Sequence, residues 1–362
     1  MRGLNNSSHD NANHDNTVNY HDKSSSISGK SQKNNGDFSK RVNNNFKTTN
    51  LTSAATSNSN FGHDNLTDSL SVGSLNTCGL KRRIEYPEFL SLVENHDIFC
   101  ISETKLDKYD VISCPGYEFF NVPRKQSYIR KSGGLGFLVR QNLIKFVELV
   151  DTHSEYIAWI KISKQFHGLD KDILIGNVYI PPQDSRFFND DEFEFFEQEI
   201  ASACSRDDYI CILGDFNAQT GELADFTSAD NFLAEYFHFD EGTVEFFDQK
   251  CVLEKYQVQI NRISMDKKKN NSGFRLIDIS KNNNLFILNG RYGQDKNIGA
   301  MTFRRTSVID YALISAKTFE IVHDFKITDV DRLFSDGHSL LTVEIQIQNN
   351  RREVHAQSTT SR

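Results

Sequence analysis

The sequence predicts an α/β fold in which two β-sheets pack together and helices cover them from outside. Two observations predict it. Short apolar runs rich in β-branched and aromatic residues alternate with helical stretches along the central part of the chain, and this strand-rich order occurs twice. The two ends, by contrast, hold few apolar residues, so one large domain between them accounts for the core.

The first half of this domain reads as one helix and five strands. Residues 85–95 place Phe89, Leu90 and Val93 on one face of a short amphipathic helix. The apolar runs that follow are compact enough for buried strands. We expect these strands at residues 97–103, 133–140, 143–150, 155–163 and 172–180.

The second half begins with a longer helix. Residues 187–204 place Phe193, Phe196 and Ile200 at helical spacing, and the acidic residues around them fit a solvated face. A long irregular insertion near 219–272 interrupts the pattern, and a helix near 274–282 follows it. We expect the remaining strands at residues 209–215, 285–289, 300–305, 307–315 and 342–347.

Composition sets the boundaries of the domain. Residues 1–71 form an Asn- and Ser-rich tail and residues 349–362 a polar one, and both are predicted to be disordered because they cannot bury enough apolar surface. The globular domain is expected at residues 72–348. No run is long and apolar enough for a membrane span, and the N-terminus lacks a secretory signal. The six cysteines form no CxxC pair, which favours free thiols and a nuclear or cytoplasmic location over a secreted one.

The charge balance argues against binding polyanions through a bulk positive field. The chain has a formal net charge of −8, and residues 76–350 carry 31 basic and 42 acidic side chains. A nucleic-acid enzyme is still compatible with this balance, because a divalent cation held by carboxylates inverts the local sign. Lys267, Lys268 and Lys269 with Arg262 form a local basic run, which fits a solvated mobile loop better than a DNA-backbone contact.

Polar side chains of catalytic types follow or interrupt the predicted strands. An isolated acid in an apolar strand costs several kcal/mol unless it is paired or bound to a metal, and Asp310 in "SVIDYALIS" is the clearest case. Turn formation explains Asp215 and Asn217 in "GDFN" taken alone, because Asp and Asn side chains bond nearby backbone groups. It does not explain the whole set: Asn76, Glu103, Tyr179, Asp215, Asn217, Asp310, Asp336 and His338.

In this order the residues resemble the endonuclease/exonuclease/phosphatase superfamily. The Asn, the Glu in "SET", the Tyr before Pro, "GDFN", "IDY" and "SD…H" follow each other as in that superfamily over residues 72–346. The chain is most similar to the apurinic-type endonuclease domain of non-LTR (LINE-type) retrotransposons and their domesticated relatives. The strings "GGLGFLVR", "RISMDKKKNNSGFRLIDIS", "LNGRYGQDKNIGAMTF" and "SVIDYALIS" are typical of that branch.

The resemblance implies a four-layer α/β sandwich of two mixed sheets, with the active site at one edge. It implies Glu103 as the principal magnesium ligand, with Asn76 beside it and Asp336 near the metal. Tyr179 would contact the scissile phosphate. The matching catalytic positions are Asp215, Asn217, Asp310 and His338, with Asp310 orienting His338.

A DNA-binding face is expected next to the catalytic positions. By the resemblance, Thr302 and Ser307 lie near that face. Arg304 and Arg305 stand in the predicted strand before Asp310 and are candidates for DNA-backbone contacts because they lie close to the expected site.

Three departures from the family pattern affect the expected site. Cys78 stands where many relatives have Asn or Asp, which removes an oxygen near the metal. Pro182 replaces an Asn and removes one phosphate contact. Gly337 separates Asp336 from His338, where relatives often join Asp directly to His. A glycine relaxes backbone limits, so the insertion either lets both side chains reach the site or misplaces one of them.

The function expected from these residues is a magnesium-dependent endonuclease that nicks DNA, with Mn²⁺ as a possible substitute. By the resemblance, the nick leaves a 3′-hydroxyl that primes reverse transcription in a retrotransposon. The chain contains no polymerase motif, so a reverse transcriptase would be encoded elsewhere, and the chain is expected to be a fragment or a stand-alone derivative. Two alternatives remain: a phosphatase of the same superfamily acting on a phosphorylated small molecule or lipid head group, and a catalytically inactive interaction module.

Overall fold

The computed structural model describes residues 69–125, 131–206, 208–228 and 248–347. The tail predicted at residues 1–71 falls outside these ranges except for Ser69–Ser71, which belong to the first strand, and the tail at 349–362 lies entirely outside them.

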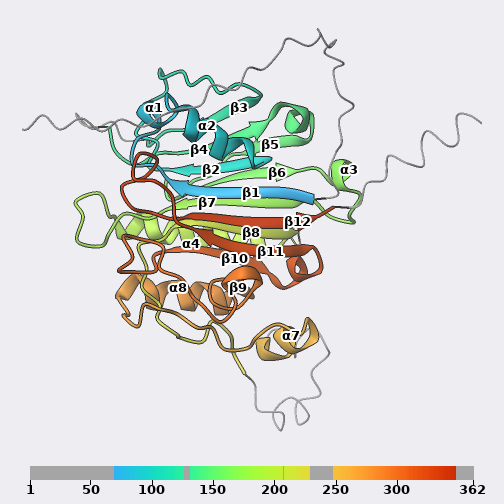
Figure 1. Ribbon diagram of the computed structural model, residues 1–362. Coiled ribbons are helices and arrows are strands. Elements are labelled where there is room, and N and C mark those ends of the chain that lie inside the picture. The colour runs from blue at the N-terminus through green and yellow to red at the C-terminus, as the bar shows by residue number, and fades with distance from the viewer. Residues whose placement is uncertain (1–68, 126–130, 207, 229–247, 348–362) are drawn as a thin grey trace, which may run out of the picture. The chain divides into compact units, whose positions relative to one another are not determined.

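Two six-stranded mixed sheets form the centre of the described part (Figure 1). The first has the order β11-β12-β1-β2-β4-β3, and the second β5-β6-β7-β8-β10-β9. The strands of the first sheet are β1 (Ser69–Asn76), β2 (Ile98–Ser102), β3 (Tyr117–Val122), β4 (Leu135–Arg140), β11 (Val322–Thr328) and β12 (Leu340–Gln346). Those of the second are β5 (Val147–Val150), β6 (Ile157–Ile162), β7 (Ile173–Tyr179), β8 (Tyr209–Asp215), β9 (Leu285–Ile287) and β10 (Asp310–Ser315).

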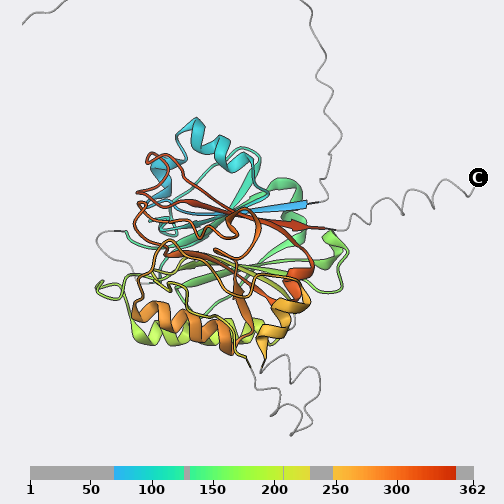
Figure 2. The same cartoon turned by 60° about the horizontal axis from the view of Figure 1, so that its bottom comes forward.

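Helices cover the outer face of each sheet, so the four-layer sandwich expected from the sequence is confirmed (Figures 1 and 2). Helices α1 (Leu80–Arg83) and α2 (Pro87–Glu94) pack Leu80, Phe89 and Val93 on the first sheet. Helices α4 (Asp190–Cys204) and α8 (Asn271–Asn282) lie along the outer face of the second sheet. The remaining helical segments are α3 (Lys164–His167), α7 (Gln249–Lys255), and the 3₁₀ turns η1 (Gln141–Phe146), η2 (Gly293–Asp295) and η3 (Ala316–Glu320).

The largest hydrophobic cluster lies between the two sheets, where alternate residues of the facing strands are buried together. Strands β1 and β2 are parallel, as are β7 and β8, and β2, β7 and β8 are mostly apolar on both faces because the sandwich buries both. Asn177 is a polar exception: its amide nitrogen donates to the carbonyls of Ile101 (2.9 Å) and Gly136 (3.0 Å), so one side chain of β7 links the two sheets.

The strand pairing brings several strand ends to one edge. Asn76 at the end of β1 pairs with Ser102 at the end of β2, and Tyr179 at the end of β7 pairs with Asp215 at the end of β8. Because β10 runs antiparallel to β8, its first residue, Asp310, also lies opposite Asp215.

The structure differs from the sequence prediction in several places. Residues 300–305 form no strand; only Phe303 makes isolated bridges, to Ser307 and His338. Residues 143–150 begin as the 3₁₀ turn η1 before β5. Strands β3 and β11 were not expected because charged and polar residues interrupt their apolar pattern. Helix α7 falls inside the stretch predicted to be irregular, where its amphipathic pattern is only seven residues long.

All six cysteines are thiols, as expected, and Cys100, Cys114 and Cys211 are buried. Of the helices in the described ranges, none combines the length and the apolar composition that crossing a bilayer requires.

Candidate active site

Asp215, Asp310 and His338 form a buried group at the edge where the strand ends meet. His338 Nδ1 lies 3.0 Å and 3.1 Å from the two carboxylate oxygens of Asp310, and its Nε2 lies 3.9 Å from Asp215 Oδ2. The short distances to Asp310 fix the tautomer, with Nδ1 donating to Asp310. The imidazole therefore turns its Nε2 toward Asp215.

Burial and charge act on these groups together. Burial opposes protonation of His338, but the charges of Asp310 and Asp215 outweigh it and raise the pKa of His338 to about 9. Burial and the neighbouring charge of Asp310 raise the pKa of Asp215 well above its usual range, against the opposing effects of His338 and of the hydrogen bond from Asn76. The imidazole of His338 thus lies between the side chains of two acids, and Asp310 is the nearer of the two.

Asn76 joins this group to Glu103. Its Nδ2 donates to Asp215 Oδ2 (2.9 Å) and to Glu103 Oε1 (3.1 Å), while its Oδ1 accepts from the backbone N–H of Cys78 (3.0 Å). Glu103 also accepts a hydrogen bond from Tyr179, and burial, followed by the charges of Glu103 and Asp215, raises the pKa of the Tyr179 phenol well above its usual value. Glu103 has a left-handed backbone (φ 50°) directly after β2, a conformation that non-glycine residues rarely adopt.

Asn217 lies at the edge of the group. Its backbone N–H donates to Asp215 Oδ1 (3.0 Å), and its side-chain Nδ2 donates to the carbonyl of Ile180 (2.8 Å). The first bond is the side-chain-to-backbone contact by which an aspartate forms a turn. Asp215 therefore forms a turn and also belongs to the candidate site. The amide has a second N–H in addition to the one that Ile180 accepts.

Asp336 lies apart from the buried group. Its side chain is 50 % exposed and forms an ion pair with Arg83 (2.8 Å). A hydrogen bond from the Cys78 thiol and the charges of Arg83 and Lys105 lower the pKa of Asp336. The predicted ligand therefore faces Cys78 and Arg83, not His338.

Gly337 accounts for the separation of Asp336 from His338. Its backbone φ of +122° is strained for any other residue, and a Cβ there would lie 2.6 Å from Arg304 Cγ. Its carbonyl accepts from the N–H of Arg304 (2.7 Å). The inserted glycine thus lets His338 reach Asp310 while Asp336 turns outward.

The four residues expected on a DNA-binding face lie in a tight turn beside His338. Thr302 is fully buried, and its Oγ1 accepts from the N–H groups of Ile309 (2.9 Å) and Asp310 (3.0 Å), so it supports Asp310 from within instead of facing solvent. Ser307 is half-buried and pairs with Phe303 across the turn. Arg304 and Arg305 are exposed at its tip, both with positive φ.

Three residues of the site were missed in the sequence. Lys105 Nζ lies 3.3 Å from Glu103 Oε2 and 2.8 Å from Cys78 Sγ. The Phe303 ring packs on the His338 imidazole with 4.5 Å between ring centroids. Arg83 pairs with Asp336. Only Lys105 had a local indication, since it stands two residues after Glu103; the other two come near the site through tertiary packing.

The arrangement offers oxygen donors suited to a hard divalent cation. Within the described residues, Asp215, Asp310 and His338 make up a group whose ligand atoms lie within 4.8 Å of one another, and the two aspartates supply its oxygen atoms. Glu103 adds a carboxylate through Asn76. Burial, followed by the charge of Asp310, raises the pKa of Asp215, and a bound cation would favour its carboxylate form.

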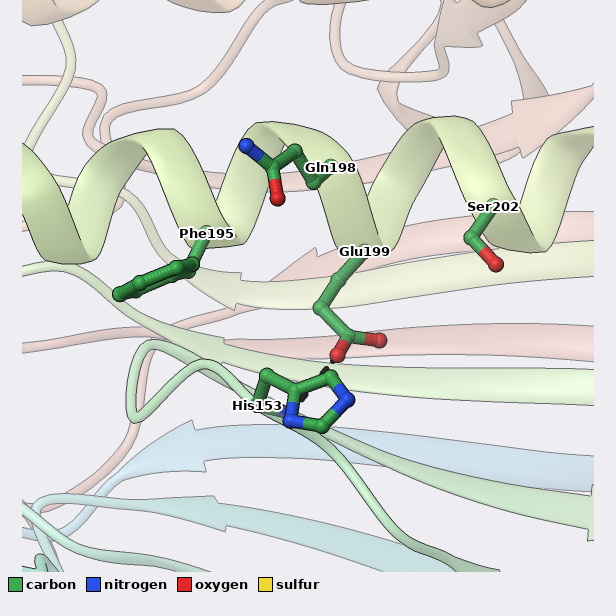
Figure 3. A pocket seen from close by; sticks show the side chains of 5 residues that line it. All are labelled: His153, Phe195, Gln198, Glu199 and Ser202. Atoms are coloured by element: carbon green, nitrogen blue, oxygen red, sulfur yellow. Dashed lines mark hydrogen bonds between the residues drawn. The ribbon is translucent and has the colours of Figure 1, made fainter.

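A cavity of about 230 Å³ lies elsewhere, against α4 (Figure 3). The N–H of His153 donates to Glu199 there (2.7 Å). Its lining contains none of the predicted site residues: His153, Phe195, Gln198, Glu199 and Ser202.

Comparisons with solved structures give matches of low sequence identity. The endonuclease domain of TRAS1, a telomere-specific non-LTR retrotransposon, has a TM-score of 0.47 and 13 % identity, covering 78 % of this chain and 100 % of that one. The AP endonuclease LMAP from Leishmania major has a TM-score of 0.49 and 11 % identity, covering 77 % and 88 %. The 3′-5′ exonuclease NExo from Neisseria meningitidis has a TM-score of 0.45 and 17 % identity, covering 76 % and 100 %. A comparison with curated proteins gives no match.

A family model provides the assignment. The model described as the Endonuclease/Exonuclease/phosphatase family matches residues 55–336, well over half of the chain. The match covers β1 through β11 and ends at Asp336, two residues before His338. The chain belongs to the Endonuclease/Exonuclease/phosphatase family.

Proposed function

We propose that the protein hydrolyses phosphodiester bonds in DNA and introduces nicks, with a bound Mg²⁺ ion for which Mn²⁺ can substitute. The observation that carries this proposal is the continuous polar chain from Glu103 through Asn76 to Asp215, His338 and Asp310. Nothing in folding requires three carboxylates and a histidine at one sheet edge, where their burial is costly.

Glu103 is the first candidate to hold the cation, with Asn76 and Asp215 beside it. Asp336 would serve as a further carboxylate only if its ion pair with Arg83 opened. When bound, the cation would polarise a phosphate oxygen and offset the negative charge that develops during hydrolysis. Lys105, 3.3 Å from Glu103, supplies a positive charge to the same carboxylate.

His338 would act as a fixed cation toward the phosphate. Asp310 holds its Nδ1, and the raised pKa keeps the imidazole protonated at neutral pH. The protonated Nε2 would then donate to a phosphate oxygen, as preorganised donors do at sites of developing charge. Phe303 limits rotation of the ring by packing on its face.

Asp215 is our candidate for accepting the proton of the attacking water. Its carboxylate lies between Asn76 and His338, and its raised pKa makes it a stronger base than an exposed aspartate. Asn217 and Tyr179 would donate to the phosphate oxygens, Asn217 through its second amide N–H and Tyr179 after its hydroxyl leaves Glu103.

Arg304 and Arg305 are proposed to contact the DNA backbone beside the cleaved bond. Both are exposed on the turn that leads from Phe303 toward Asp310. The two faces of this turn therefore differ: Phe303 and Thr302 support the catalytic pair. The arginines are exposed, with Arg304 donating to the carbonyl of Asp336 (3.2 Å) and Arg305 in an exposed ion pair with Asp329 (2.9 Å) that a DNA phosphate would replace.

In its biological setting, we propose that the domain derives from a retrotransposon and leaves a 3′-hydroxyl that primes a reverse transcriptase encoded elsewhere. Such a role would place it in the nucleus or the cytoplasm. The support for this origin is the set of sequence strings typical of the LINE-type branch.

Nicking of supercoiled plasmid by the full chain tests the proposal. We expect nicking with Mg²⁺, none with EDTA, and a loss of at least about a hundredfold in Glu103→Ala and in His338→Ala. Glu118→Ala and His323→Ala, at exposed positions on β3 and β11, are matched controls that should keep full activity. If the folded chain gives no magnesium-dependent nicks, the proposal is wrong.

A further inference from the structure

An apolar surface rimmed by lysines lies next to the candidate active site. Ile263 is 37 % exposed, Met265 55 % and Ile298 50 %. Exposed apolar side chains that lie singly need no explanation, but these three are neighbours: the N–H of Met265 donates to the carbonyl of Gly299 (2.9 Å), directly beside Ile298.

The backbone holds these side chains outward. Along residues 262–266 exposed and buried residues alternate, as in a strand. The buried Asp266 accepts from Gln219 Nε2 (2.8 Å) and from the N–H of Val308 (3.2 Å), and the buried Arg262 donates to the carbonyl of Leu223 (2.9 Å). Because Arg262 and Asp266 are held in the interior and the side chains alternate, Ile263 and Met265 must face solvent.

Gly299 fixes the neighbouring loop against the same segment. A Cβ at this position would lie 2.1 Å from the carbonyl oxygen of Ile263, and its φ is +62°. Only glycine allows this close approach. The surface formed by Ile263, Met265 and Ile298, called here the Met265 surface, is therefore a packed feature and not a loosely held loop.

The Met265 surface is connected to the catalytic segments. Gln219 follows Asn217 by two residues, Val308 precedes Asp310 by two, and Asp266 binds both. Three exposed lysines near this surface, Lys268, Lys269 and Lys296, make its surroundings positively charged. Lys267 adds no net charge because it forms an ion pair with Glu222 (2.6 Å).

We propose that the Met265 surface packs on the deoxyribose edges of duplex DNA beside the cleaved phosphodiester, with the three lysines on adjoining phosphates. This inference rests on the proposed function. Lysines favour a polyanion, and among polyanions DNA offers apolar sugar edges between its phosphates. In RNA a 2′-hydroxyl would stand against these side chains without a partner, so the surface selects DNA over RNA.

Equilibrium binding of the full chain to a short labelled DNA duplex and to the RNA duplex of the same sequence tests this inference. EDTA is present throughout, so that cleavage does not enter the measurement. We expect M265S/I298S to bind DNA about tenfold more weakly, with a smaller effect on RNA, so that the preference for DNA shrinks. L149S/F195S removes similarly exposed apolar side chains from β5 and α4 and should leave both affinities unchanged.

The lysines give an independent readout. K268Q/K269Q should reduce the slope of log K against log salt by about 2, because each phosphate contact contributes about 0.9. K145Q/K164Q, at exposed positions near β5, should leave the slope unchanged.

The outcomes separate this inference from the proposed function. Unchanged DNA affinity and unchanged DNA preference in M265S/I298S would overturn the inference, and this is the result expected if the surface binds a protein instead. If the wild type nicks DNA and M265S/I298S binds DNA unchanged, the proposed function would hold and only the inference about the Met265 surface would be wrong. Weakened binding in M265S/I298S without nicking by the wild type would support DNA contact by the Met265 surface and would remove the proposed function.

Discussion

At the scale of single residues, the site depends on a few side chains whose partners are already in place. Asn76 donates to two carboxylates, Asp310 holds His338, and Thr302 caps the backbone of Asp310. Each of these contacts fixes the direction of a neighbour, and such preorganisation is what lets donors act on a developing charge without rearranging.

Gly337 is the residue whose replacement should disturb this order most. Gly337→Ala would have to accommodate a Cβ 2.6 Å from Arg304 Cγ at a φ of +122°. We expect a loss of about 1–3 kcal/mol in the free energy of unfolding, and a drop in nicking greater than tenfold as His338 moves off Asp310. Gly116→Ala is the control, since its φ is +76° with no atom within 4 Å of the new Cβ. Equal activity in both variants would contradict the role given to Gly337.

The charge of His338 should depend on Asp310. In the metal-free protein, the pKa of His338 is raised to about 9 although burial lowers it, because Asp310 and Asp215 favour the imidazolium. Asp310→Asn removes the nearer charge, so we expect the pKa of His338 to fall clearly in an NMR titration of the ring. The ring signals of the exposed His323 in the same spectra are the control and should be the same in both proteins. A His338 pKa that is the same in both proteins would refute the pairing.

At the scale of elements, two buried polar contacts hold strands and loops to the sandwich. His96 follows α2 and lies buried against the first sheet, with Nδ1 facing the carbonyl of Leu92 (3.0 Å) and Nε2 facing Thr342 Oγ1 of β12 (3.1 Å). Asp225 binds Arg291 through two hydrogen bonds and accepts the N–H of Ile287 in β9 (2.8 Å).

His96 should make stability depend on pH. Burial lowers the pKa of His96 from 6.5 to about 4, so between these values the unfolded chain binds a proton that the folded chain does not. The stability that His96 contributes is therefore present above pH 6.5 and is lost as the pH falls toward 4, by about 3 kcal/mol. Chemical denaturation of wild type and His96→Gln across this range checks it. The same pH dependence in both would show that His96 does not cause it.

Removal of the Asp225 charge should destabilise the protein strongly. Arg291 and Asp225 are fully buried, and Arg262 lies 3.8 Å from the same carboxylate. Asp225→Asn leaves two buried guanidinium groups without their anion, and we expect a loss of about 3–5 kcal/mol by denaturant unfolding. Glu148→Gln breaks the exposed pair with Lys161 and should have little effect. A small loss for Asp225→Asn would mean that the cluster is not an electrostatic clamp.

At the scale of the whole molecule, the described part of the chain combines the fold of its family with a candidate site at one edge of the two sheets. The sequence predicted the two sheets, the outer helices and the candidate residues. This was possible because the spacing of apolar residues and the polar residues at strand ends can both be recognised within a short stretch of sequence. It did not predict β3, β11 or α7, whose patterns are short or interrupted.

The contacts within the candidate site were also only partly predictable from the sequence. Asp310, Asp215 and His338 come together as a buried group, but no local pattern indicates that Asp336 pairs with Arg83 or that Phe303 packs on His338. These contacts join residues far apart in the chain and depend on how loops pack. The sequence raised the question of whether Asp336 and His338 both reach the site across the inserted Gly337. It could not answer that question, because the answer depends on the backbone conformation of Gly337 and on the position of Arg304.

The most direct test of the central claim is the chemistry of the product end. Covalently closed plasmid DNA is treated with the full chain and Mg²⁺, and a DNA polymerase is then added without any treatment of the ends. If the protein hydrolyses an internal phosphodiester to a 3′-hydroxyl, the polymerase extends the nick at once, and His338→Ala gives no extension. If the plasmid stays closed while the same folded protein releases inorganic phosphate from a soluble phosphomonoester, the protein is a phosphatase of its family and the nuclease account is wrong.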